Sequence, residues 1–140
     1  SCVCQGLYLF DAKNIHFGGG QSKFEFCDLY HEPSKTLYFV KHVSASNHFS
    51  HLSEQVRRTV ELVFGPDDSF RTKLIAKINK LHPKLDTAWL NGRPQQRDIN
   101  LCIVSMVKHY KDYPFFAKCG LARLLKELQR ANHNVTFLSV

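Results

Sequence analysis

The stretch FEFCDLYHEPSKTLYFVKHVSASNHFSHLSEQ, residues 24–55, decides the fold of this chain. Thr36 to Val43 is rich in β-branched and aromatic residues, and this composition predicts a strand. Lys23 to His31 predicts a second strand by the same criterion. Glu32 to Lys35 between them reads Glu-Pro-Ser-Lys, which is a turn sequence. We therefore expect a β-hairpin that leads into a helix.

The expected hairpin register sets which side chains meet. If the four turn residues form the loop, His31 faces Thr36 and Asp28 faces Phe39. Side chains two residues apart on a strand share a face, so Asp28 and Lys41 project on the same side within diagonal reach. A surface ion pair between them, worth about 0.2–1 kcal/mol, is the alternative to a catalytic role.

Two helices are expected after the hairpin. Ser44 to Ser50 carries polar helix-start residues, and Gly65-Pro66 ends the first helix. Gln55 lies on or beside the apolar stripe of this helix, so the spacing allows it to approach Asp28 and Lys41. The members of the stripe are Leu52, Val56, Val60 and Val63. A second helix is expected from Asp67 to Leu81.

The rest of the chain completes an α/β pattern. Asn14 to Ser22 and His82 to Arg97 contain Gly or Pro and predict loops. The remaining strands are expected at Gln5–Asp11, Ile99–Val107 and Val135–Val140, and the remaining helix at Gly120–Ala131. The order β-β-β-α-α-β-α-β implies one mixed sheet flanked by helices, antiparallel at the hairpins and parallel around the last helix.

Composition limits the class of protein. The 140 residues fit one domain, residues 1–140, and a hydrophobic fraction of 44% argues against disorder. No apolar run approaches the ~18 residues of a membrane-spanning helix, so no membrane partner is expected. Five irregularly spaced cysteines suit a reducing, cytoplasmic location. The chain starts at Ser1 without an initiator Met or signal peptide, so we expect a fragment of a larger protein.

Positive charge dominates the chain. Lysine and arginine exceed aspartate and glutamate by seven, which suits nucleic acid as partner but also serves solubility alone. The polar sides of the two middle helices supply candidate phosphate contacts: Arg57, Arg58, Arg71, Lys73, Lys77 and Lys80. The last helix adds Lys118, Arg123, Lys126 and Arg130. A solvated helix face without a ligand is the alternative reading.

Several short motifs resemble a known protein family in their order and spacing. They are Glu25-Phe26-Cys27-Asp28-Leu29, Phe39-Val40-Lys41-His42, Ser50-His51-Leu52 with Gln55, Tyr113-Pro114-Phe115-Phe116-Ala117-Lys118 with Leu121, and Val135-Thr136-Phe137. They are similar to the C-terminal half of a sporadically distributed, largely uncharacterised prokaryotic family found near mobile-element and defence genes. The family pattern has His in place of Phe39 and Ser in place of Ala117. The resemblance implies that an N-terminal half belongs to the intact protein.

The hairpin and helix are also similar to the restriction-endonuclease-like nuclease fold. That resemblance implies that an acidic pair, including Asp28, holds Mg²⁺ or Mn²⁺ at the scissile phosphate. It implies that Lys41 orients or activates water and that Gln55 braces the site. His51 joins the catalytic candidates because it matches the family pattern.

The second acid of this expected pair is missing. Phe39 stands where the nuclease pattern has Glu or Asp, two residues before the lysine. Glu25 or Asp11 would have to supply the carboxylate, but Glu25 has the opposite strand parity from Asp28. The sequence thus leaves two functions open: metal-dependent cleavage of DNA or RNA in a defence or mobile-element context, or non-catalytic binding of nucleic acid or a protein.

Overall fold

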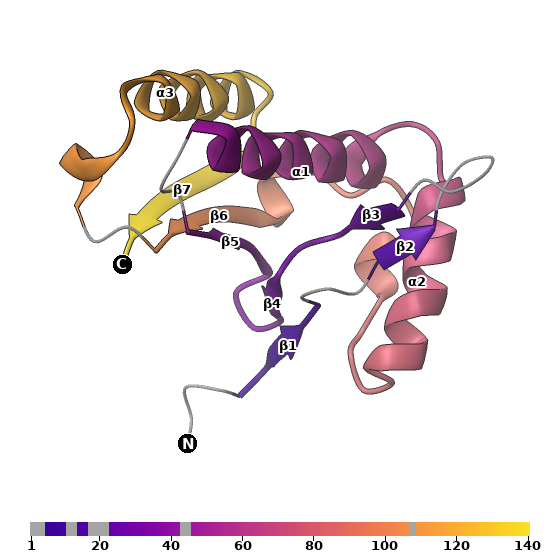
Figure 1. Cartoon of the computed structure of the whole chain (residues 1–140). Helices are drawn as coiled ribbons and strands as arrows, with labels where there is room; N and C mark the ends of the chain where they lie inside the picture. Colours follow the sequence, from indigo (N-terminus) through magenta and orange to yellow (C-terminus); the bar gives the residue numbers. More distant parts are fainter. Residues whose placement is uncertain (1–4, 11–13, 17–22, 43–45, 107–108) are drawn as a thin grey trace.

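A five-stranded mixed sheet forms the centre of the computed structural model, which describes residues 5–10, 14–16, 23–42, 46–106 and 109–140 (Figure 1). The strand order is β1-β4-β5-β6-β7. The strands span Leu7–Leu9 (β1), Leu29–His31 (β4), Thr36–Lys41 (β5), Asn100–Ser105 (β6) and Asn134–Ser139 (β7). β1, β4 and β5 are antiparallel, whereas β6 and β7 run parallel to β5. The predicted α/β class with a mixed sheet is confirmed.

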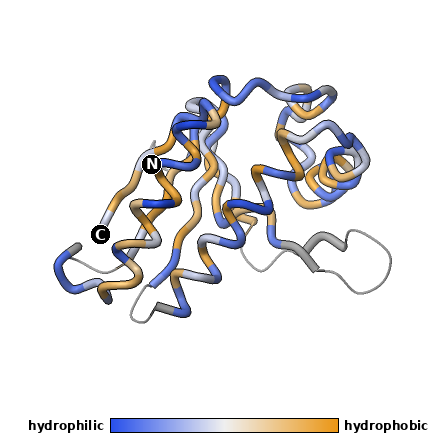
Figure 2. The backbone as a smooth tube through the Cα atoms, turned by 90° about the horizontal axis from the view of Figure 1, so that it is seen from above, coloured by the Kyte–Doolittle hydropathy of each residue, from blue (hydrophilic) through white to orange (hydrophobic). Residues whose placement is uncertain are grey.

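Three helices accompany the sheet: α1 spans Ser46–Phe64, α2 spans Ser69–Leu81 and α3 spans Phe115–Arg130. α1 and α3 lie side by side over one face of β5, β6 and β7, and α2 stands beyond the end of α1 (Figure 1). Hydrophobic and hydrophilic residues alternate along the helical parts of the backbone (Figure 2). Each helix therefore has an apolar side to pack inward. No helix of the described residues is long and apolar enough to cross a membrane.

The predicted hairpin register is confirmed where β4 pairs with β5. His31 is the partner of Thr36, and Leu29 is the partner of Tyr38. Lys35, in the turn, has a positive φ of 51°. The register follows from local information, because the turn sequence fixes the loop length and the strand composition fixes its two sides.

The strand predicted over Lys23–His31 is divided in the structure. β3, Lys23–Glu25, leaves the main sheet and pairs with β2, Asn14–His16, in a separate two-stranded sheet. The prediction of one continuous strand was wrong: Phe26 and Cys27 belong to no strand, and the carbonyl oxygen of Phe26 accepts a hydrogen bond from the Thr59 hydroxyl on α1 at 2.6 Å. That bond is made to a helix rather than to a neighbouring strand. The predicted loop after Asn14 also begins with a strand.

The last helix begins five residues before the predicted start at Gly120. Gly120 lies inside α3, where it leaves room for the ring of Phe49 on α1. A Cβ at this position would lie 2.8 Å from the ring. The glycine therefore marks a close approach of two helices and not a helix boundary.

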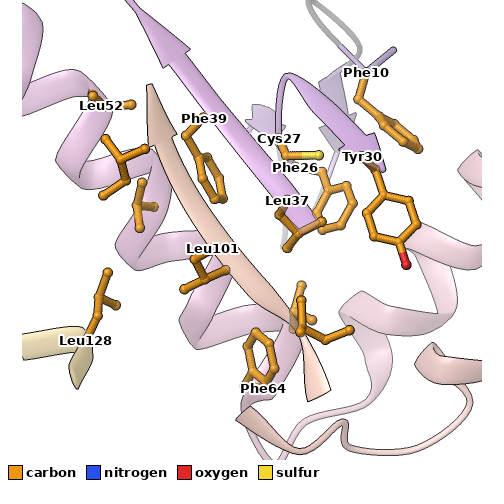
Figure 3. Close-up of a cluster of buried hydrophobic side chains, with 14 of the residues drawn as sticks. Phe10, Phe26, Cys27, Tyr30, Leu37, Phe39, Leu52, Phe64, Leu101 and Leu128 are labelled. Carbon is orange, nitrogen blue, oxygen red and sulfur yellow. The ribbon is translucent and has the colours of Figure 1, made fainter. Parts of the chain in front are cut away.

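The core lies between the sheet and the two covering helices. Phe39 of β5, Leu101 of β6, Leu52 of α1 and Leu128 of α3 are among its members (Figure 3). Phe39 is 0% exposed. In the segment between α2 and β6, which was predicted as a loop, Trp89 stacks on Tyr30 with ring centroids 5.5 Å apart.

Candidate functional site

The parallel strands end at one edge of the sheet, which we call the strand edge. It consists of the last residue of each strand and the residue that follows it: Lys41 and His42 for β5, Ser105 and Met106 for β6, and Ser139 and Val140 for β7. Backbone hydrogen bonds hold it together, from Met106 N–H to Lys41 O at 3.0 Å and from Val140 N–H to Ser105 O at 2.8 Å. Both α1 and α3 begin at this end of the molecule (Figure 1). Ligands of open α/β sheets bind outside the carboxyl ends of the strands, so this edge is the first place to look for a site.

Asp28 lies in the segment between β3 and β4, and its hydrogen bonds continue the pairing with the neighbouring strands beyond the end of β4. Its carboxylate oxygen Oδ2 accepts a hydrogen bond from Val40 N–H at 2.7 Å. Its own N–H donates to Tyr38 O at 3.0 Å, and its carbonyl accepts from Phe10 N–H at 2.8 Å. The Asp28 side chain therefore takes the place of a backbone carbonyl beside β5.

The structure brings Asp28 and Lys41 to the same part of the sheet. The Asp28 carboxylate is bonded to the residue before Lys41, and the Lys41 side chain is exposed at the strand edge. That the two side chains share one face within diagonal reach stays a prediction.

Gln55 and His51 lie on α1 above the segment that leads to Asp28. Thr59 of α1 is hydrogen-bonded to Phe26, and Gln55 is one helical turn before Thr59 on the same side of the helix. The Gln55 Nε2 atom is buried and has no hydrogen-bond partner among the described residues. His51, one further turn toward the strand edge, is exposed. An unpaired buried amide is unusual and costs about 1–3 kcal/mol, so Gln55 is a candidate for a polar contact with a ligand.

The acids proposed as metal ligands do not converge in the described structure. Glu25 belongs to β3 and pairs with Asn14 in the separate sheet. Because β3 ends at Glu25 and β4 begins at Leu29, Glu25 and Asp28 do not belong to one regular strand, and alternation of side chains along a strand does not relate them. Asp11 lies outside the described residues. Across residues 5–10, 14–16, 23–42, 46–106 and 109–140, no three His, Cys, Asp or Glu side chains are grouped as metal ligands.

Cys27, next to Asp28, is suited to a structural role. Burial raises the pKa of its thiol well above the usual value, and the negative charge of Asp28 raises it further. Because nucleophiles and metal ligands are thiolates, a buried neutral thiol serves neither purpose.

Arg57 connects the two covering helices. Its Nε donates to the Glu127 carboxylate of α3 at 3.1 Å, and its Nη1 donates to the Ser53 hydroxyl at 3.0 Å. Its neighbour Arg58 is exposed. Of these two predicted phosphate contacts, Arg57 is thus already engaged within the protein.

The lysines of α2 form a continuous cationic line, which we call the lysine stripe: Lys73, Lys77 and Lys80. Lys73 and Lys80 are exposed, and Lys77 is half-buried. Spacings of four and three residues keep all three on one side of the helix. No acidic residue occurs from Ser69 to Leu85. Lys73 and Lys77 were predicted from their polar positions, whereas the absence of acids along the whole segment is a signal that the prediction did not use.

A pair of aromatic side chains at the start of α3 was not predicted as a functional feature. Phe115 and Phe116 are 70% and 75% exposed, the highest values among the exposed large hydrophobic residues of the described chain. The sequence contains the signal, since Phe115 and Phe116 fall outside the helical spacing of Leu121, Leu124 and Leu128.

Removing the Asp28 carboxylate is expected to destabilise the sheet. Asp28→Ala loses the charge-assisted bond to Val40 N–H, so the free energy of unfolding should fall by about 1.5–3 kcal/mol. Asp28→Asn keeps an acceptor oxygen and should lose less. Urea unfolding of both variants measures the difference. Equal stability of Asp28→Ala and the wild type would show that the bond to Val40 has no structural weight.

The comparisons with known proteins address family but not activity. No curated protein and no solved structure matches the chain. The sequence model described as "Family of unknown function (DUF6119)" matches residues 2–140. An uncharacterised family is what the resemblance of the motifs implied. The chain therefore belongs to the DUF6119 family.

Proposed function

We propose that this domain binds nucleic acid through the lysine stripe of α2. The observation that supports the proposal is the charge of this helix, which carries only cationic residues among its ionised side chains. The lysine and arginine excess of seven over the whole chain has the same sign. A one-sided excess of positive charge attracts polyanions and speeds their association.

The geometry of the stripe suits a phosphate backbone. Lys73 and Lys80 are seven residues apart, which is ~10 Å along a helix that rises 1.5 Å per residue. Phosphates on one strand of a duplex follow each other at about 3.4 Å along the axis, so the stripe matches roughly three base pairs. Ammonium groups at this spacing displace counterions without reading bases. We expect affinity that depends on salt and only weakly on sequence.

Reversing two charges of the stripe is expected to weaken binding. In Lys73→Glu/Lys80→Glu, two attractions become repulsions, and the affinity for a labelled DNA or RNA duplex should fall about tenfold or more. Fluorescence anisotropy at low and at physiological salt measures the change.

The matched control changes the same charge elsewhere. Arg123 and Lys126 are exposed on α3, away from the stripe, and Arg123→Glu/Lys126→Glu alters the net charge equally. This control should retain most of the affinity. An equal loss in both variants would mean that net charge, and not the stripe, governs binding. An affinity that does not change with salt concentration would instead favour a protein partner.

Metal-dependent cleavage of DNA or RNA is the second candidate function, and the strand arrangement favours it. The meander β1-β4-β5, then helices, then the parallel strand β6 is the arrangement implied by the resemblance to restriction-endonuclease-like nucleases. Asp28 and Lys41 lie beside its strand edge. Among the described residues, Glu25 belongs to the separate β2-β3 sheet and no three or more His, Cys, Asp or Glu side chains are grouped to hold a metal ion, so these residues do not fit Mg²⁺ or Mn²⁺.

A cleavage assay with Mg²⁺ or Mn²⁺ separates the two candidates. Turnover that disappears in both Asp28→Ala and Lys41→Ala would support the nuclease, provided that urea unfolding shows both variants folded. Turnover that is intact in both variants would exclude this site. Binding without turnover is the result that the lysine stripe predicts.

A further inference from the structure

We propose that Phe115 and Phe116 form a stacking platform for unpaired bases, at the end of the molecule where β5, β6 and β7 finish. This inference rests on the proposed function and extends it, because it adds unpaired bases to the duplex backbone that the lysine stripe binds. The platform lies at the start of α3, whereas the lysine stripe lies on α2 beyond the far end of α1 (Figure 1). The two surfaces are therefore separate and can be tested separately.

The exposure of the two rings is the first observation. A phenylalanine that is 70% or 75% exposed gives up most of the ~1.5–3 kcal/mol that burial would provide. The rest of α3 follows the expected pattern, with Ala117, Leu121 and Leu124 buried. Two adjacent aromatic rings facing water are thus an exception within an otherwise regular amphipathic helix, as is typical of binding surfaces.

The rings are carried by a fixed part of the backbone. Tyr113, just before them, is buried and meets Phe137 of β7 edge to face, with ring centroids 6.0 Å apart. Ala117, just after them, is also buried. Phe115 and Phe116 lie edge to face to each other at 5.5 Å and 72°. Their faces can therefore receive planar groups without a loop having to fold first.

The charges around the rings favour a polyanion as occupant. Lys118, one turn into α3, donates to the carbonyl of Lys111 at 3.1 Å, which places this ammonium group between the two segments. Lys111 is exposed, as is Lys41 at the strand edge. Asp112 is an exposed acid next to Lys111, so Lys111 and Lys118 leave a positive balance around the start of α3. Aromatic faces combined with lysines are how proteins hold single-stranded nucleic acids, since every base has a face to stack.

The test compares one sequence in two forms. A labelled oligonucleotide of about 20 nucleotides is bound as a single strand and as a duplex by the wild type, Phe115→Ala/Phe116→Ala and Phe115→Trp/Phe116→Trp. The alanine variant should lose at least about tenfold in affinity for the single strand, since stacking on aromatic rings supplies much of such binding. It should bind the duplex as the wild type does. The tryptophan variant keeps two aromatic faces and should retain the wild-type affinity for the single strand.

Each outcome decides one of the two proposals. Unchanged single-strand binding in the alanine variant would overturn the platform, while duplex binding that is sensitive to Lys73→Glu/Lys80→Glu would leave the lysine stripe standing. A wild type that binds neither form would overturn both. Loss of a protein contact in the alanine variant, with single-strand binding intact, would assign the rings to a protein partner and also overturn the platform. Both rings are exposed, so the variants should fold, and circular dichroism checks this.

Discussion

Phe39→Glu should unfold the domain instead of completing a nuclease site. The position is the one where the nuclease pattern has its second acid, but the side chain is 0% exposed and lies in the core with Leu52 and Leu101 (Figure 3). The change removes a buried ring and leaves an unpaired carboxylate in its place. We expect a loss of about 5 kcal/mol or more in the free energy of unfolding. That is as large as the whole stability of many domains.

The control for this prediction keeps the core apolar. Phe39→Leu changes shape with a smaller loss of volume and should cost about 1–2 kcal/mol. Circular dichroism and urea unfolding of both variants measure the contrast. A folded Phe39→Glu protein that gains Mg²⁺-dependent cleavage would contradict the prediction and would identify the strand edge as a metal site that lacks one acid.

Arg71→Ala should also be strongly destabilising, although the sequence placed Arg71 among the phosphate contacts. That placement was wrong because the side chain is only 3% exposed. Its Nη1 donates to Val63 O at 3.0 Å and to Gly65 O at 2.7 Å, at the C-terminal end of α1. Carbonyls at the end of a helix lack partners within the helix and attract a cation. Arg71→Ala removes both hydrogen bonds, so the free energy of unfolding should fall by about 3 kcal/mol.

A conservative change separates charge from geometry at this position. Arg71→Lys keeps the charge but not the planar fork, so its stability should lie between the wild type and Arg71→Ala. Urea unfolding gives the order. At urea concentrations below its unfolding midpoint, the Arg71→Ala protein is folded, and its affinity for duplex should depend on salt as that of the wild type does. A weaker salt dependence without any loss of stability would make Arg71 a surface contact.

The hairpin could be predicted because its determinants are local. A four-residue turn with Pro33 and two strand-forming flanks fix the register of His31 and Thr36. The division between β3 and β4 could not be predicted, because the carbonyl that leaves the strand pattern at Phe26 is bonded by Thr59, 33 residues away in the sequence. The polarity of Arg71 suggested a surface position, but a long side chain can fold back onto a neighbouring helix end.

The candidate site, like the fold, could be predicted only where it depends on local sequence. Strand pairing brings the Asp28 carboxylate to Val40, the residue before Lys41, and Gln55 lies one helical turn before Thr59, which bonds Phe26. What the pattern could not show is that the Asp28 carboxylate bonds the backbone, because that follows from the break in the strand. The buried phenylalanine at position 39 and the departure of Glu25 to another sheet leave the predicted acidic pair incomplete among the described residues.

The salt dependence of duplex binding tests the central proposal most directly. The logarithm of the association constant is measured against the logarithm of the salt concentration for the wild type and for Lys73→Glu/Lys80→Glu. If both lysines neutralise phosphates, the slope of the variant should be less negative by about 2, because each contact contributes roughly 0.9. Parallel lines for the two proteins would contradict the assignment of the lysine stripe as the nucleic-acid contact.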